Sequence, residues 1–329
     1  MHAEDQAAQV DAFGDYMMQM WRGLKSTGWH WFGYHFSNGP TPFGMAIVRS
    51  CMAIDRAAPR IGTTLFGELL SIGGRDRYEP HYEQLLQKMS EILVIERIVT
   101  ANWPEGTTFE QEPQVRRGGK RPELLVTTEA DRFVIEVKTP SQLTHIRNRA
   151  TNPNQLSYRS VVGRRTAETL LDGETTLPRD NQILGFLKDA DAKFADFHDG
   201  LTTSMLVIVW DDFIYEPISV LMNAESGLLT ANTYAKDGSG EPLAFPNVDA
   251  VVALRHLNYF ISGSREEPLI DRTNAMDFGD DRAMPNVIFP VLNQGPMMAR
   301  VVERLRAYPY GDPVLVGAEY QVSDMVFWL

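Results

Sequence analysis

Residues 121–140 read "RPELLVTTEADRFVIEVKTP" and contain two apolar runs, 124–126 and 133–137, on either side of a polar turn. Short apolar runs rich in β-branched residues and joined by a turn predict a β-hairpin. Glu123 opens the first run, whereas Glu136 and Lys138 close the second. Because residues two apart on a strand point to the same face, we expect two carboxylates and an ammonium to meet where the strands of this hairpin end.

The segments around the hairpin predict a mixed α/β core. Residues 82–99 repeat apolar side chains at the three-and-four spacing of a helix, and "NWPEG" ends that helix. A strand over 107–115 and a glycine turn over 116–121 precede the hairpin. A helix over 158–171, a helix over 179–197 and strands over 204–213 and 248–256 follow it. We therefore expect a central mixed sheet flanked by helices.

The two ends of the chain are expected to add to this core. Residues 1–75 are predicted to form a helical region packed on the core, residues 76–262 the core itself, and residues 263–329 a C-terminal extension. The stretch "GWHWFGYHF" contains His30 and His35 among aromatic residues. A packed aromatic cluster is favoured there over a metal site, because no helical HxxxH pair is present.

The composition narrows the class of protein. No run approaches 18 apolar residues, which argues against a membrane span, and the acidic N-terminal stretch argues against a secretory signal. Cys51 is the single cysteine, so intrachain disulfides and cysteine-based zinc sites are excluded. These features predict a cytoplasmic protein.

Charge is unevenly spread along the chain. The net charge is −12, yet residues 114–167 carry eleven Lys or Arg against four Asp or Glu, a net of +7 that leaves −19 for the rest. A solvated surface and a phosphate-binding surface both fit such a basic segment. The carboxylates of Glu123 and Glu136 add a second signal, because oxygen ligands of this kind suit Mg²⁺ or Mn²⁺.

The hairpin resembles the PD-(D/E)XK nuclease superfamily, which has the restriction-endonuclease-like fold. The residues that carry the resemblance are Pro122-Glu123 on the first strand and Glu136-Val137-Lys138 on the second. The resemblance implies a Mg²⁺-dependent deoxyribonuclease that hydrolyses DNA phosphodiester bonds with a metal-activated water, with Glu123, Glu136 and Lys138 as its catalytic residues. Members most often carry Asp where this chain has Glu123, which is one methylene longer.

The resemblance also implies further site residues. A carboxylate from the preceding helix commonly joins the metal ligands, and Glu96 (within the apolar stripe) and Glu91 (nearly opposite it) both remain candidates. Gln182 resembles a polar residue that relatives place on the helix after the motif, with Lys193 further along the same helix. The nucleic-acid-binding candidates are Gln182, Arg147, Arg149, Arg164 and Arg165.

Two other interpretations stay open. One is a catalytically inactive nuclease-like module that binds nucleic acid or a protein partner, which Glu123 at the usual Asp position and the acidic remainder of the chain favour. The other is an acidic globular protein whose motif is accidental. Sequence alone leaves open whether the chain forms a homodimer and which proteins it binds.

Overall fold

The computed structural model describes residues 3–151, 169, 179–211, 214–279, 283–291 and 296–316. The fold is mixed α/β, and the seven strands found in these residues form one mixed sheet in the order β1-β2-β3-β4-β5-β6-β7. The predicted fold class, a central mixed sheet flanked by helices, is confirmed at this level. The chain divides into two compact units, Met1–Gln111 with His256–Ala283, and Glu112–Arg255 with Met284–Leu329.

The first unit is mainly helical. Its elements are α1 (Ala3–Thr27), α2 (Tyr34–Ser37), α3 (Pro42–Ala57), α4 (Ile61–Ser71), α5 (Glu79–Val99), β1 (Thr108–Gln111) and α10 (Leu257–Ser264). The predicted aromatic cluster is present, since the ring of Phe32 contacts those of His35, Phe43 and Tyr82 edge-on. The two histidines of this stretch also form hydrogen bonds with backbone carbonyl groups. His30 bonds to the carbonyl of Leu69, and His35 bonds to the carbonyl of Ser264.

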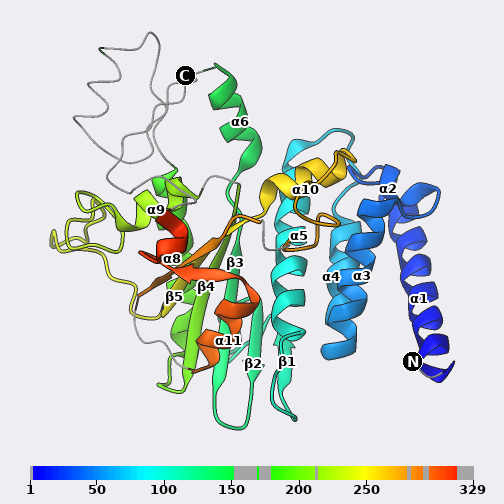
Figure 1. Cartoon of the computed structure of the whole chain (residues 1–329), viewed down its shortest axis with the longest axis horizontal. Coiled ribbons are helices and arrows are strands. Elements are labelled where there is room, and N and C mark those ends of the chain that lie inside the picture. The colour runs from blue at the N-terminus through cyan, green and yellow to red at the C-terminus, as the bar shows by residue number, and fades with distance from the viewer. Residues whose placement is uncertain are drawn as a thin grey trace. The chain divides into compact units, whose positions relative to one another are not determined.

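The second unit contains the rest of the sheet (Figure 1). Its strands are β2 (Leu124–Thr127), β3 (Arg132–Lys138), β4 (Thr202–Trp210), β5 (Ala250–Arg255), β6 (Asn286–Pro290) and β7 (Ala307–Pro309). β2 and β3 pair antiparallel as the predicted hairpin, whereas β3, β4 and β5 run parallel to one another. β6 then pairs antiparallel to β5 and parallel to β7. The parallel strands are buried almost throughout, as expected of strands covered on both faces.

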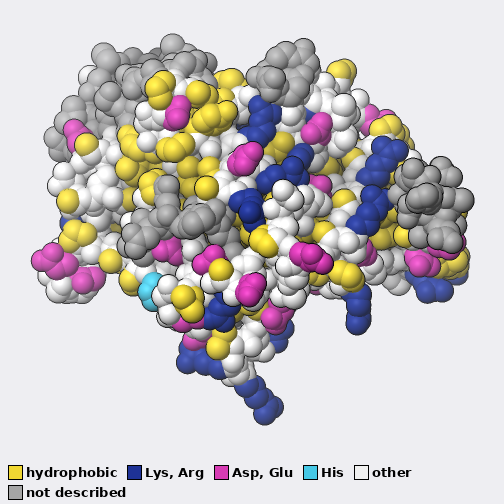
Figure 2. Space-filling model, turned by 60° about the horizontal axis from the view of Figure 1, so that its bottom comes forward, with side chains coloured by type: hydrophobic (Ala, Val, Ile, Leu, Met, Phe, Trp, Pro, Cys, Tyr) yellow, Lys and Arg dark blue, Asp and Glu magenta, His cyan; other side chains and the backbone are white. Residues whose placement is uncertain are grey.

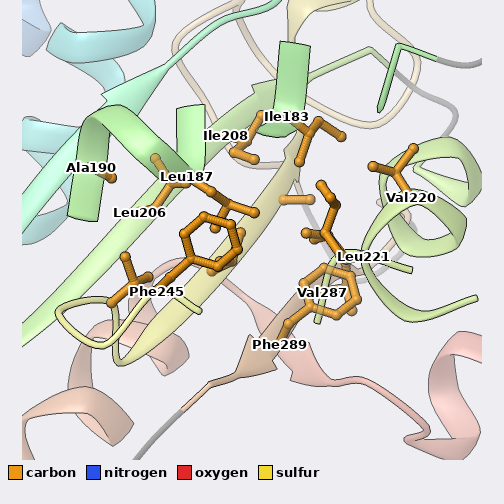
Figure 3. Packing of buried hydrophobic residues seen from close by; sticks show 14 of the residues in the cluster. Ile183, Leu187, Ala190, Leu206, Ile208, Val220, Leu221, Phe245, Val287 and Phe289 are labelled. Carbon is orange, nitrogen blue, oxygen red and sulfur yellow. The ribbon is translucent and has the colours of Figure 1, made fainter. Parts of the chain in front are cut away.

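The helices of this unit are α6 (Gln142–Thr151), α8 (Asp180–Phe194), α9 (Tyr215–Met222), α11 (Pro296–Arg304) and α12 (Pro313–Val316), with a 3₁₀ turn, η1, over Ala195–Phe197. The apolar side of α8, with Ile183, Leu187 and Ala190, packs on Leu206 and Ile208 of β4 in one buried cluster (Figure 3). Val134 of β3 belongs to the same cluster, so α8 covers the sheet face toward which alternate residues of β3 point.

The element order matches the sequence prediction, with α5, β1, β2, β3, α8, β4 and β5 in that succession. One difference is α6, a helix where the sequence indicated only a polar, basic insertion; most of its described side chains are exposed, so it lacks the apolar stripe that would have predicted it. The predicted helix over 158–171 lies outside the described residues apart from residue 169. In the described part of the chain, the length and apolarity needed to cross a membrane are not found in any helix.

Candidate functional site

Glu123 lies at the open end of the hairpin, close to Glu136. The paired register ends with Leu124 opposite Ile135, and Glu123 directly precedes Leu124. The Glu123 N–H donates to the Ile135 carbonyl at 2.9 Å, which holds Glu123 against the second strand. Two carboxylates that lie close together repel each other unless a cation lies beside them.

Two lysine ammoniums supply that compensation. Lys193 Nζ of α8 lies 2.5 Å from Glu136 Oε1 and 3.9 Å from Glu123 Oε1. Lys138 Nζ lies 2.8 Å from the same Glu136 Oε1. Glu136 is completely buried, and its Oε2 has no hydrogen-bond partner among the described residues. A buried carboxylate oxygen without a partner is costly, so it marks a place where a further cation or donor would be stabilising.

Asp189 connects the two lysines on the side of α8. Its Oδ2 lies 2.7 Å from Lys138 Nζ and 3.9 Å from Lys193 Nζ, and its Oδ1 lies 3.0 Å from Lys120 Nζ. Asp189 and Lys193 are four residues apart and therefore share one side of the helix. We call Glu123, Glu136, Asp189, Lys120, Lys138 and Lys193 the carboxylate–lysine cluster; its three carboxylates and three ammoniums have a formal charge of zero.

The cluster shifts the pKa of two of its members. Burial alone would lower the pKa of Lys138, but the charge of Glu136 and the hydrogen bond to Asp189 outweigh burial and raise it. Burial likewise favours a higher pKa for Asp189, but hydrogen bonds from Lys138 and Lys120 lower it to about 2. At neutral pH the cluster therefore holds Asp189 as a carboxylate and Lys138 as an ammonium.

Arg179 fixes the N-terminal end of α8, the helix that carries Asp189 and Lys193. Arg179 Nη2 lies 2.5 Å from Glu216 Oε2 and 2.9 Å from Asp211 Oδ2, and its backbone N–H donates to Glu216 Oε1 at 2.7 Å. Its guanidinium also stacks on Trp210, 4.0 Å from the ring centroid. Burial would raise the pKa of Glu216, but the charge and hydrogen bonds of Arg179 lower it.

The helix carboxylates proposed as further metal ligands already have basic partners. Glu91 is buried and pairs with Lys88, which also binds Glu68 at 2.8 Å. Glu96 is partly buried and lies 3.5 Å from Arg97. All of these residues belong to the first unit. The burial of Glu91 differs from the exposed position that its place opposite the apolar stripe indicated.

The nucleic-acid-binding candidates are more dispersed than the metal-ligand candidates. Gln182 lies in the first turn of α8, eleven residues before Lys193, which is roughly 16 Å along a helix. Arg147 is exposed on α6, and the side chain of Arg149 lies outside the described residues. Arg164 and Arg165 also lie outside them.

Three members of the cluster, Lys193, Asp189 and Lys120, are not among the site residues that the sequence predicts. The sequence places Lys193 on the same helix as Gln182 and assigns no role to Asp189 or Lys120. A signal did exist, because Lys193 follows the apolar residue Ala190 by three positions and so lies at the edge of the buried stripe of α8. This position predicts a contact between Lys193 and Glu136 only if α8 is known to cover the face of β3 that bears Glu136.

Basic side chains of the turn over 116–121 are largely matched by acids. Arg116 Nε lies 3.0 Å from Asp196, and Arg121 lies 3.5 Å from Glu112. On the face of the molecule shown in Figure 2, Lys and Arg side chains are likewise interspersed with Asp and Glu. In this turn, Arg116, Lys120 and Arg121 each lie within 3.5 Å of an acid.

Few of the described side chains are grouped in a way that could bind a metal ion. Among the described residues, no group of three or more His, Cys, Asp or Glu side chains is arranged to hold a metal ion. Mg²⁺ needs fewer protein ligands than that, because it commonly keeps several waters and binds one or two carboxylates together with substrate phosphates. Glu123 and Glu136, with the unpartnered Glu136 Oε2, fit that requirement.

Comparisons with protein-family models, with curated proteins and with solved structures give no match. The chemistry of the site therefore has to be inferred from its own residues.

Proposed function

We propose that this chain is a metal-dependent nuclease that hydrolyses DNA phosphodiester bonds, with Glu123, Glu136 and Lys138 as its catalytic residues. The observation that carries the proposal is the fully buried Glu136, whose Oε2 has no partner among the described residues and which shares the ammonium of Lys193 with a second carboxylate, Glu123. Natural sequences seldom bury an acid in a sheet without a use for it.

Glu123 and Glu136 would hold one Mg²⁺ or Mn²⁺ ion. When bound there, the ion would supply Lewis acidity toward a water and toward the phosphate oxygens of a phosphodiester substrate.

Lys138 has a defined part in the same scheme. Its ammonium lies 2.8 Å from Glu136 Oε1 and stays charged, because Glu136 and Asp189 raise its pKa. A fixed positive charge beside the carboxylates stabilises the negative charge that develops on the phosphate oxygens during hydrolysis. Lys138 also keeps the acids from repelling an anionic substrate.

The architecture is consistent with this assignment. Glu123 directly precedes β2, and Glu136 and Lys138 lie on β3, after a helix and one strand and before α8 and β4. That succession is the one expected of a restriction-endonuclease-like core, and we propose this finer fold assignment as well.

A second function, an inactive nuclease-like module that binds nucleic acid, is favoured by a separate observation. The ammoniums of Lys138 and Lys193 already neutralise Glu136, and no set of three potential ligands was found among the described residues. In that case the cluster would be a permanent ion-pair network that holds α8 on the sheet.

A cleavage assay separates the two functions. Supercoiled and linear DNA are incubated with the whole chain in Mg²⁺, Mn²⁺ or EDTA, alongside Glu136→Ala, Lys138→Ala and the control Glu129→Gln, an exposed acid in the hairpin turn. We expect divalent-dependent cleavage that both alanine variants lose and the control retains.

Cleavage that persists undiminished in both alanine variants would contradict the proposed site. DNA binding that is unaffected by EDTA, with no cleavage under either divalent ion, would select the inactive module.

A further inference from the structure

Lys193 occupies the place that a cation shared by the two acids of the hairpin would take. Its Nζ lies 2.5 Å from Glu136 Oε1 and 3.9 Å from Glu123 Oε1. The side chain is only 16% exposed, and that of Glu136 is fully buried, so solvent screens this contact weakly. The ammonium thus does for the like-charged pair what a divalent ion would do.

An ammonium and a divalent ion cannot both hold this position. Both would occupy the space between Glu123 and Glu136, and each repels the other at short range. The second contact of Lys138 is with Asp189, at 2.7 Å. Lys193 is the lysine whose ammonium contacts Glu136 and also lies 3.9 Å from Glu123.

Lys193 also has a second acceptor within reach. Asp189 Oδ2, one turn earlier on α8, lies 3.9 Å from its Nζ and is partly exposed to solvent. A rotation about the flexible lysine side chain would bring the ammonium to Asp189 without movement of the helix. The charge of Lys193 therefore need not be left unpaired when it leaves Glu136.

We propose that Lys193 is a positioning residue that holds the metal-free site together and is displaced to Asp189 when a divalent ion binds between Glu123 and Glu136. The proposal rests on the proposed function for the identity of the ligand. Lys193 then sets the affinity of the site for the divalent ion. The same place between Glu123 and Glu136 holds either the ammonium or the metal ion.

Mn²⁺ binding measured by calorimetry tests the displacement on the whole chain. Lys193→Met keeps the length of the side chain and removes the competitor, so we expect about ten- to a hundredfold tighter Mn²⁺ binding, as for loss of one charged hydrogen bond. Lys120→Met removes an equal charge from the same cluster but from the far side of Asp189, and Lys188→Met removes an exposed charge from the same helix. We expect much smaller changes in both. Equal Kd values for Lys193→Met and Lys120→Met would overturn the displacement and leave only a general effect of charge.

A measurement on the unaltered protein does not depend on how the variants fold. Acetylation of lysines, followed by mass spectrometry, reports how available each ammonium is. We expect Mn²⁺ to speed modification of Lys193 relative to Lys188; no change at Lys193 on saturation with Mn²⁺ would contradict the proposal.

Failure of this inference and failure of the proposed function give different results. Divalent-dependent cleavage with unchanged Mn²⁺ affinity in Lys193→Met would reject the displacement and keep the nuclease. Tighter Mn²⁺ binding in Lys193→Met, without cleavage by the parent chain, would support the displacement and reject the nuclease. Absence of Mn²⁺ binding in the parent chain and in Lys193→Met would reject both.

Discussion

Replacing Arg179 with methionine should loosen α8, because Arg179 holds the N-terminal end of that helix. The arginine side chain donates to Glu216 from Nε at 3.0 Å and from Nη2 at 2.5 Å, and to Asp211 at 2.9 Å. All three side chains are about nine-tenths buried. In Arg179→Met, Glu216 keeps the backbone N–H bond of residue 179 but loses both side-chain bonds from Arg179.

The expected loss is large for a single substitution. Removing one partner from a buried ion pair costs about 3–5 kcal/mol, because the other charge stays buried without compensation. Since 1.4 kcal/mol corresponds to a factor of ten, amide hydrogens of α8 should exchange about a hundredfold faster or more if they exchange through this opening. Urea unfolding and peptide-resolved hydrogen exchange together measure the effect.

Two controls make the result specific. Arg132→Met breaks a pair with Asp199 that is about 40% exposed, and surface pairs contribute roughly 0–1 kcal/mol. Adding Glu216→Gln to Arg179→Met removes the uncompensated charge and should recover most of the loss. Equal losses for Arg179→Met and Arg132→Met, or unchanged exchange in α8, would refute the assignment of Arg179 as the anchor of this helix.

Three further predictions concern stability. The pKa of Asp189 is about 2 in the folded chain against an ordinary 3.8, so its stabilisation is complete only above the ordinary value and is lost as pH falls toward 2; the difference in unfolding free energy between parent and Asp189→Asn should shrink over that window in acid titrations. Burial lowers the pKa of His256 to about 3, so the unfolded chain takes up the proton first and stability should fall between about pH 6.5 and 3; in His256→Gln a flatter profile is expected, and an identical one would contradict this cause. Gly185→Ala in α8 meets no atom within 4 Å and should stabilise by about 0.5–1 kcal/mol in urea unfolding, whereas Gly62→Ala would place its Cβ 2.0 Å from the Cys51 carbonyl oxygen and should destabilise by about 1–3 kcal/mol; the same sign for both would contradict the packing.

The hairpin was predictable because its signals are local. The turn and the two short apolar runs over 121–140 predict both strands, and the two-residue period of a strand brings Glu136 and Lys138 to one face. The helix predicted over 82–99 occurs as α5, Glu79–Val99, for the same reason. In such segments the apolar period and the breaking residues are close in sequence and agree.

The remainder of the cluster depends on contacts between distant segments. Lys193 meets Glu136 across 57 residues, and Lys120 meets Asp189 across 69. No period in the sequence states which face of the sheet α8 covers or how far along the strand it lies. The return of His256–Ala283 to the first unit is likewise set by packing over long sequence separation, which local patterns do not record.

The central claim is that Glu123 and Glu136 share a divalent ion, and anomalous diffraction from crystals soaked in Mn²⁺ tests it most directly. We predict an anomalous peak between the two carboxylates, within bonding distance of Glu136 Oε2, with Lys193 Nζ moved toward Asp189. Well-occupied soaks with no peak at this place, and Lys193 still bonded to Glu136, would contradict the metal site and leave the cluster as an ion-pair network.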